Sequence, residues 1–477
     1  MEIARTGRAR EYISRGMVHS AILAGGFGQR LDAIADPTRN KWALAKPATP
    51  VGNIRIIEFS IGALRKAGIH ELNLLTCHLP ETIRHVVGDG KIYGEETRIK
   101  ELTEQASDPL DTAGAVGRLV FNEGWTENSN DIVVIPSADI VHNVDLEAVV
   151  DVHLFNKENH NAVGTIVVNP VRWDSVERFG TVRLENMPRR ENFGSELEFE
   201  DAVGAYLMDR QGASLKIEEF REKKSRFIQT SLPEAQRYQE VALSNLNNSS
   251  IYVFNASFFR TLLKMLTKKD TESPLVPQEY EAGGPTPFSD WGRHVFKWLT
   301  EKAQLENFPI FAYIMPKSGY WRDAGIGEEL RLANMDVLDG RLETGLSNGE
   351  GKFWHKMDLD SWKGNNVFID PSAYISRSII GDNVIIGPGA RIIHSVVGRD
   401  TRIDPGVEMW GSVIFPRHRS NPNPNIIGSR SQVSDSLILG GALDPESHVR
   451  NAALFTPVTG LALGSLLGKT QYLSPKK

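Results

Sequence analysis

Two groups of residues near the amino terminus have the types and the spacing needed to bind phosphate. Gly25, Gly26 and Gly28 directly follow a predicted strand in the motif AILAGGFGQRL. Such glycines let the backbone approach an anion, so that successive amide groups point at phosphate oxygens. Arg30 adds a permanently charged guanidinium, and Lys46 precedes a proline-stiffened loop where its ammonium could neutralise a polyphosphate. No Walker Gly-Lys-Ser/Thr follows, and a tight turn and a surface lysine are the structural alternatives.

These residues need a scaffold, and residues 17–140 have the pattern of a parallel sheet covered by helices. Short β-branched runs alternate there with helical stretches, in the order strand, helix, strand, helix, strand. Between Asn161 and Pro316 strands outnumber helices, which predicts a mixed sheet that extends the first. We therefore predict an α/β domain over residues 17–345, preceded by a flexible arm at residues 1–16.

A different rhythm begins after about residue 364 and predicts a β-helix. Aliphatic residues recur there at intervals of five or six, usually before turn-forming residues, at Ile369, Ile375, Ile380, Ile386, Ile392, Val397, Ile403 and Met409. Three such steps close one triangular coil, so Ile369, Ile386 and Ile403 should stack at a 17-residue period. A β-sandwich would not keep so constant an interval. We expect the β-helix and its tail to cover residues 364–477, after a linker at 346–363, with residues 415–431 as a projecting loop.

Composition excludes several classes of protein. The chain has 477 residues, 40% of them hydrophobic and 24% charged, which is ordinary for a globular protein of roughly two or three domains. A net charge of −6 does not favour nucleic acid or an anionic membrane as the main partner. No long apolar stretch is present, and the single cysteine, Cys77, excludes an internal disulfide. We expect a soluble protein of the reducing cytoplasm.

Four motifs together resemble the sugar-phosphate nucleotidyltransferases: AGGFGQRL, AKPATPVG, TAGAV and the aspartate that ends VVIPSAD. The segments RIIEFSIGALRKAGI, SIYVFN and GYWRDAGIGEELRLANMDVL, followed by the repeats, look most like the bacterial glucose-1-phosphate adenylyltransferases. The resemblance covers roughly residues 17–443. It implies a Rossmann-like nucleotidyltransferase domain and a left-handed parallel β-helix, through which similar enzymes form dimers or tetramers.

The resemblance also implies a reaction and the residues that bind the nucleotide. A nucleoside triphosphate, with ATP as the first candidate, would react with a sugar 1-phosphate, first glucose 1-phosphate, to give a nucleotide sugar and pyrophosphate. The positions that match the family's nucleotide-binding elements are Leu23, Ala24, Gly25, Gly26, Gly28, Arg30, Thr112, Ala113 and Gly114. The lysine that contacts phosphates in the family matches Lys46. Asp111 replaces the usual first glycine of the GTAGA element, which leaves the choice of base open.

Two aspartates match the pair that binds Mg²⁺ in similar enzymes, Asp139 and Asp323. A hard dication favours carboxylate oxygens, and it would neutralise a triphosphate that otherwise repels the incoming phosphate. Arg30, Lys46 and Asp139 then form the implied catalytic set. Because the attacking phosphate is already ionised, the expected in-line displacement needs no protein nucleophile.

The sugar-phosphate site is implied by the segment IEEFREKK. Glu222 and Lys223 match a Glu-Lys element whose carboxylate accepts sugar hydroxyls and whose ammonium binds the phosphate. Gly180 matches a glycine that allows close approach of the sugar, and Asn248 lies where the family contacts it. A solvated run of charges is the alternative explanation of the segment.

Other functions stay open at this stage. The long stretch between Leu31 and Lys46 departs from the glucose-1-phosphate enzymes, so guanylyl transfer, or transfer to another hexose or a cyclitol phosphate, is an alternative. A non-catalytic regulatory subunit would keep the fold but predicts erosion of the charged residues, which are present. A hexapeptide acyltransferase would need a histidine on a coil, for which His394 is the candidate. A nicotinamide dehydrogenase would need the full dinucleotide fingerprint, which AGGFGQ lacks.

Overall fold

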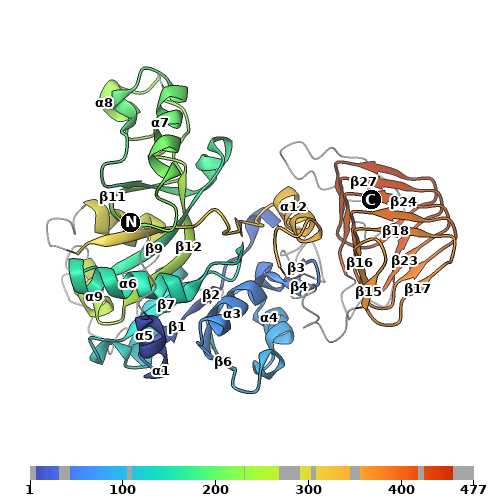
Figure 1. Cartoon of the computed structure of the whole chain (residues 1–477), viewed down its shortest axis with the longest axis horizontal. Coiled ribbons are helices and arrows are strands. Elements are labelled where there is room, and N and C mark those ends of the chain that lie inside the picture. Colours follow the sequence, from blue (N-terminus) through green and yellow to red (C-terminus); the bar gives the residue numbers. More distant parts are fainter. Residues whose placement is uncertain are drawn as a thin grey trace.

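The computed structural model describes residues 7–31, 43–104, 110–229, 231–267, 290–301, 308–343, 355–416 and 424–454. A mixed α/β domain and a three-sided solenoid lie side by side along the longest axis of the molecule (Figure 1). Helix α12 (Gly327–Leu338) lies between them. The predicted α/β fold class, followed by a parallel β-helix, is confirmed.

The central sheet of the α/β domain has seven strands in the order β1-β7-β12-β10-β11-β13-β9, and β12 also pairs with β9. The strands are β1 (Val18–Ser20), β7 (Ile132–Pro136), β9 (Gly164–Pro170), β10 (Gly180–Leu184), β11 (Ser214–Glu222), β12 (Leu246–Asn255) and β13 (Ile310–Ile314). β1 and β7 are parallel, whereas β12 runs antiparallel to β7. The sheet is mixed, as the two halves of the sequence pattern predict.

A smaller parallel sheet continues the first one beyond β1. It consists of β2 (Ile22–Ala24), β5 (Glu71–Thr76) and β6 (Arg98–Thr103). β2 follows β1 after one residue, and a bridge from Leu23 to Ser137 keeps it beside the end of β7. The carboxyl ends of β2 and β7 therefore meet at one edge, which is where open α/β sheets bind ligands.

Helices cover both faces of these sheets. The longer ones are α3 (Ile56–Lys66), α4 (Pro80–Val87), α5 (Asp111–Asn122), α6 (Leu146–His160), α7 (Glu196–Met208) and α9 (Phe258–Thr267). Short helices are α8 (Glu234–Arg237) and α11 (Lys297–Glu301), which follows a π-helical turn at Trp291–Phe296. α5 packs in an apolar core with Phe254, and α3 and α6 pack in a second core with Ile132. Burying apolar stripes on both faces explains why β2 and β7 are buried along their whole length.

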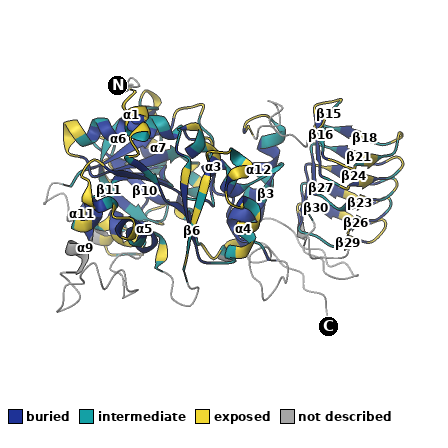
Figure 2. Ribbon diagram, turned by 90° about the horizontal axis from the view of Figure 1, so that it is seen from below, coloured by how far each residue is buried: buried dark blue, intermediate teal, exposed yellow. Residues whose placement is uncertain are grey.

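The amino-terminal segment differs from the flexible arm that we expected. Residues Arg8–Ser14 form helix α1, which packs on α6 (Figure 2). Ala9 is buried, and its amide donates a hydrogen bond of 2.8 Å to Asp151 Oδ1. Arg10 pairs with Glu147 at 2.7 Å. The charges that looked like those of a frayed arm have their partners far along the chain, where sequence patterns cannot reveal them.

The solenoid has three sheets, one for each side of its triangular coil. The first contains β15 (His355–Met357), β16 (Ser361–Lys363), β19 (Ile379–Ile380), β22 (Val396–Val397), β25 (Val413–Ile414), β28 (Leu437–Ile438) and β31 (Ala453–Leu454). The second contains β17 (Phe368–Ile369), β20 (Ile385–Ile386), β23 (Thr401–Ile403), β26 (Asn425–Ile427) and β29 (Ala442–Leu443). The third contains β18 (Tyr374–Ser376), β21 (Arg391–Ile393), β24 (Glu408–Trp410), β27 (Gln432–Ser434) and β30 (His448–Arg450). Ile386 pairs with Ile369 on one side and Ile403 on the other, which confirms the predicted stacking.

Two predicted boundaries need correction: the end of the linker before the β-helix and the extent of the projecting loop within it. Strand β16 pairs in parallel with β19, so residues that we expected in the linker already belong to the first sheet. Strand β26 pairs with β23, so the coil resumes inside the segment predicted to project as a loop. In both places backbone pairing continues where the aliphatic pattern is interrupted. Residues 417–423 of that segment and the tail from residue 455 lie outside the described residues.

Helix α12 joins the two domains. Its Leu330 and Ala333 belong to one apolar cluster with Ile379 and Val396 of the β-helix. Arg331 donates to the carbonyl oxygen of Gly411 at 2.8 Å. Just after the helix, Asp339 accepts hydrogen bonds from Arg377 at 2.5 Å and His394 at 2.9 Å. His394 is thus part of a structural contact between the domains.

Candidate active site

The glycine loop begins where β2 ends, at the edge shared with β7. Gly25 lies against the end of β5, so closely that a Cβ atom there would be 3.1 Å from Cβ of Cys77. Gly28 has φ 61°, in the left-handed region that favours glycine. Arg30 follows in a short 3₁₀ turn, Gln29–Leu31. The loop thus turns sharply away from the sheet and presents backbone groups and one guanidinium to the space above it.

Lys46 connects two distant parts of the chain. It opens a second 3₁₀ turn, Lys46–Ala48, which is stiffened by Pro47, and it is only 5% exposed. Its ammonium donates hydrogen bonds to Asp139 Oδ2 at 3.0 Å and to Asp323 Oδ1 at 2.7 Å. The two predicted metal ligands therefore converge on the same ammonium group.

A two-stranded pairing brings the aspartates together. Asp139 follows β7, and the next residues form β8 (Val141–His142). β8 pairs antiparallel with β14 (Trp321–Arg322), so that Arg322 lies opposite Val141. Asp323 directly follows β14 and consequently lies beside Asp139. Ser137 fixes the other oxygen of Asp139, because its hydroxyl donates to Oδ1 at 2.7 Å.

Three cations surround Asp323. Besides Lys46, Arg30 Nη2 lies 3.0 Å and Arg178 Nη2 lies 3.6 Å from Asp323 Oδ2. Burial by itself raises the pKa of Asp323, but Lys46 and Arg30 outweigh it and hold that pKa far below its usual range. Burial likewise lowers the pKa of Lys46, but Asp139 and Asp323 outweigh it and raise the pKa above its ordinary value. Lys46 and Asp323 are therefore both charged, and Asp139 lies against the same ammonium group.

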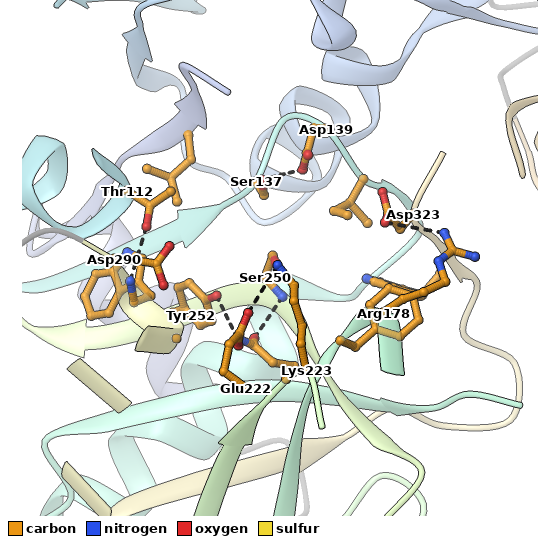
Figure 3. Close-up of a pocket in the computed structure, with 18 of the residues that line it drawn as sticks. Thr112, Ser137, Asp139, Arg178, Glu222, Lys223, Ser250, Tyr252, Asp290 and Asp323 are labelled. Carbon is orange, nitrogen blue, oxygen red and sulfur yellow. Dashed lines mark hydrogen bonds and ion pairs between the residues drawn. The ribbon is translucent and has the colours of Figure 1, made fainter. Parts of the chain in front are cut away.

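Two cavities adjoin at this cluster. The glycine-loop cavity is lined by Leu23, Ala24, Gly25, Gly26, Phe27, Gly28, Lys46, Pro47, Leu75, Thr76, Cys77, Glu104, Asp111, Thr112, Ala115, Ser137 and Asp139. The Glu222 cavity is lined by Leu23, Arg30, Thr112, Ser137, Asp139, Ile140, Arg178, Phe179, Gly180, Glu222, Lys223, Asn248, Ser250, Tyr252, Asp290, Trp291, Gly292, Trp321 and Asp323. Figure 3 shows the second cavity, with Asp139 on one side and Glu222 and Lys223 facing it from another. A molecule in each cavity would meet the other at Asp139.

Glu222 is clamped between two glycines in the Glu222 cavity. Pairing of β10 with β11 places it opposite Gly180. A Cβ atom at Gly180 would lie 2.6 Å from Glu222 Oε2, and one at Gly292 would lie 2.5 Å from the same oxygen. Burial raises the pKa of Glu222, although Lys223 counteracts it with an ion pair of 3.3 Å. Both glycines are thus needed to leave room for this carboxylate.

Most of the predicted site residues line one of the two cavities. Leu23, Ala24, Gly25, Gly26, Gly28, Lys46 and Thr112 line the glycine-loop cavity, and Gly180, Glu222, Lys223 and Asn248 line the other. Ala113 and Gly114 are buried in α5 and line neither cavity, whereas Asp111, Thr112 and Ala115 of the same helix line the glycine-loop cavity. Asp111 lines the glycine-loop cavity with a left-handed φ of 59°, and burial raises the pKa of its carboxyl group.

Several lining residues were missed by sequence reasoning. Arg178 and Trp321 lie next to predicted residues, but nothing in their spacing marks them as ligands. Asp290 and Trp291 follow a stretch without a clear pattern, and Thr112 Oγ1 accepts a hydrogen bond of 3.2 Å from the amide of Trp291. Only contacts between elements far apart in the sequence bring these residues to the cavity.

The two aspartates have the chemistry to hold a divalent cation. Among the described residues no group of three or more His, Cys, Asp and Glu side chains is placed to hold a metal ion. Asp139 and Asp323 nevertheless both reach the single ammonium of Lys46, which shows that they can share one positive charge. Carboxylate oxygens are the donors that Mg²⁺ prefers, and Mg²⁺ is usually held by one or two carboxylates together with substrate phosphates. The pair therefore fits that ion.

Comparison with protein families agrees with this arrangement. The family model described as nucleotidyl transferase matches residues 19–340, which include both cavities and α12. The chain belongs to the nucleotidyl transferase family. A second model, bacterial transferase hexapeptide, matches residues 364–394, and this nucleotidyltransferase thus carries a left-handed β-helix as its second domain.

Curated relatives of this nucleotidyltransferase are named glucose-1-phosphate adenylyltransferase. Those of Bacillus cereus (strain ATCC 14579) and Bacillus anthracis are each 28% identical over 334 residues, covering 68% of this chain and 69% of theirs. That of Bacillus cytotoxicus is 26% identical over 367 residues, covering 75% of this chain and 77% of its own. Within the described part of the chain, none of the helices has the length and apolar character needed to span a bilayer.

Proposed function

We propose that the protein transfers a nucleotidyl group from a nucleoside triphosphate to a sugar 1-phosphate, with ATP and glucose 1-phosphate as the first pair to test. The observation that carries the proposal is that Lys46, Asp139 and Asp323 converge where the two cavities adjoin. The names of the relatives support the choice of the first pair. GTP, and another hexose or a cyclitol phosphate, are the alternatives for the same reaction.

The two cavities have different chemistry, which supports one reactant in each. The glycine-loop cavity offers backbone groups of Gly25 to Gly28 and the Lys46 ammonium, as a triphosphate requires. The Glu222 cavity offers the Glu222 carboxylate for sugar hydroxyls and the Lys223 ammonium for a phosphate. The α-phosphorus of the triphosphate would then face the sugar phosphate near Asp139.

The reaction is an in-line displacement at the α-phosphorus. An oxygen of the sugar phosphate forms a new bond to that phosphorus, and the bond from the phosphorus to the oxygen bridging the α- and β-phosphates breaks. Pyrophosphate leaves with the electron pair, and no proton has to move, because the attacking oxygen is already ionised. The barrier then depends on positioning and on neutralising charge.

The side chains of the cluster have separable tasks. Arg30 and Lys46 would neutralise the phosphates of the nucleotide, and burial of Lys46 makes that charge more effective than in water. Asp139 and Asp323 would hold Mg²⁺, which when bound supplies further positive charge between the two reactants. Ser137 keeps the Asp139 carboxylate oriented toward the junction of the cavities.

The test is a grid of the four common nucleoside triphosphates plus dTTP against several sugar 1-phosphates and an inositol phosphate. Pyrophosphate release is measured with and without Mg²⁺. We expect release that depends on both substrates and on the metal ion. Hydrolysis of a triphosphate without an acceptor, or no release with any pair, would contradict the proposal and favour a non-catalytic subunit.

A further inference from the structure

Arg178 has one edge of its guanidinium engaged and the other edge without a hydrogen-bond acceptor. Nη1 donates to Glu329 Oε1 of α12 at 2.7 Å. Nε and Nη2 are shielded from solvent, and neither has a hydrogen-bond acceptor among the residues that the structure describes. Leaving such a group without an acceptor costs about 1–3 kcal/mol. Among the described residues, Arg178 is the arginine in which two such buried nitrogens lack an acceptor.

Arg178 lies at the end of the Glu222 cavity that contains Asp323. The residue lines the Glu222 cavity, and its Nη2 atom is 3.6 Å from Asp323 Oδ2, too far for a hydrogen bond. The amide of Lys223 donates to the carbonyl oxygen of Phe179 at 3.1 Å, which places Arg178 beside the strand end that carries Lys223. In Figure 3 Arg178 lies next to Asp323, at the opposite end of the cavity from Thr112 and Asp290.

The guanidinium is held in a fixed orientation. Glu329 fixes Nη1, and the ring centroid of Phe179 lies 5.2 Å from the guanidinium carbon. Phe179 in turn packs edge-on against Trp321 of β14, the strand that directly precedes Asp323. Such an arrangement leaves little side-chain entropy to lose when an anion binds.

We propose that Arg178 binds the phosphate of the sugar 1-phosphate through the Nε and Nη2 edge of its guanidinium. These two N–H groups are adjacent and parallel, which matches two oxygens of one phosphate. Arg178 would hold the attacking phosphate from the Asp323 side while Lys223 holds it from the other. The inference rests on the proposed function for the identity of the ligand.

The test compares Arg178→Gln and Arg178→Lys with the wild type and with Arg172→Gln. Arg172 is a matched control, because its side chain is 86% exposed and forms an ion pair with the nearby Asp174 at 2.7 Å. Binding of glucose 1-phosphate and mannose 1-phosphate is measured by calorimetry, so the readout does not require turnover. The Michaelis constants for both substrates and the melting temperature are measured in parallel.

We expect Arg178→Gln to weaken binding of the sugar phosphate by about 10- to 100-fold, the range for losing a charged hydrogen bond. Arg178→Lys should recover part of that loss, since it restores the charge without the paired donors. Arg172→Gln should behave as the wild type, and the Michaelis constant for the nucleotide should change less than about threefold in all variants.

The outcomes separate this inference from the proposed function. Arg178-dependent binding by a protein that releases no pyrophosphate would support the phosphate site and contradict the proposed reaction. Turnover with an unchanged Michaelis constant for the sugar phosphate in Arg178→Gln would overturn the site and leave the reaction standing. A lower melting temperature together with weaker binding of both substrates would show that Arg178 has only a structural role and would overturn the inference. Wild-type protein that binds neither sugar phosphate would overturn it as well.

Discussion

The charged cluster and the β-helix are built from opposite kinds of contact. Lys46 bonds to residues 93 and 277 positions away in the sequence, and each of these contacts is ionic. In the β-helix, buried aliphatic residues stack on residues one coil away, and Ser378 and Ser395 bond to serines that are 17 positions earlier. The attraction within a buried ion pair offsets the cost of removing both charges from water poorly. Burial of stacked apolar side chains, in contrast, stabilises the folded state directly. The comparison indicates that the first region is arranged for binding and the second for rigidity.

The largest expected effect comes from removing one carboxylate of the charged cluster. Asp323→Asn and Asp139→Asn should each lower kcat by at least about 100-fold, because a preorganised charge at the junction of the cavities is lost. Steady-state pyrophosphate release measures this. Asp174→Asn, at an exposed aspartate, is the control and should leave kcat unchanged. Near-normal turnover in either cluster variant would refute the proposed metal role.

A substitution in the apolar core of the β-helix should lower the stability of that domain and leave kcat unchanged. Ile386 is fully buried, so Ile386→Ala should lower the free energy of unfolding of that domain by about 2–4 kcal/mol. Its neighbour Ile385 is 49% exposed, and Ile385→Ala should cost much less. Calorimetry measures both. If Ile386→Ala changed kcat well below its melting temperature, the separation between the two regions would fail.

A smaller effect is expected where the fold makes room for Glu222. A methyl group at Gly292 would meet Glu222 Oε2 at 2.5 Å, and this oxygen ends a flexible side chain that can move aside. Gly292→Ala should therefore fold but raise the Michaelis constant for the sugar phosphate about tenfold, which corresponds to one lost hydrogen bond. The control is Gly204→Ala on α7, where a Cβ atom would meet nothing within 4 Å. An equal rise in the Michaelis constant for the nucleotide would show that the effect of the substitution is not confined to the Glu222 cavity.

The last comparison concerns acid, where the effect is absent at neutral pH and grows as the pH falls. Burial lowers the pKa of His153 to about 3, while its value in the unfolded chain is about 6.5. His153 therefore stays neutral in the folded state at pH values where it gains a proton in the unfolded chain. Its contribution to the free energy of unfolding is complete above about pH 6.5. As the pH falls toward 3, this contribution is lost at up to about 1.4 kcal/mol per pH unit.

His153→Gln removes this titration and should flatten the pH dependence of the unfolding free energy of the α/β domain between pH 6.5 and 4.5. Chemical denaturation at several pH values measures the slope. The unfolding of the β-helix serves as the internal control, since His153 lies in the other domain. Equal slopes for the variant and the wild type would contradict the assignment.

The same contrast explains what the sequence could and could not predict. The stacking of Ile369, Ile386 and Ile403 follows from the local spacing of aliphatic residues in the sequence, and this spacing recurs in every coil. Asp139 and Asp323 could be named from motifs, but their proximity could not, because it depends on the pairing of β8 with β14. Arg178 and Asp290 carry no motif and reach the cavity only through tertiary packing. Helix α1 was missed for the same reason, since its partners lie in α6.

Helix α12 is clamped at both of its faces. Glu329 on this helix holds Arg178 and also accepts from Arg322, the residue before Asp323, at 2.5 Å. Two positions further on, Arg331 is bonded to the β-helix. Because Glu329 and Arg331 belong to the same helix, a change in the angle between the two domains would also strain the hydrogen bonds that hold Arg178 and Arg322.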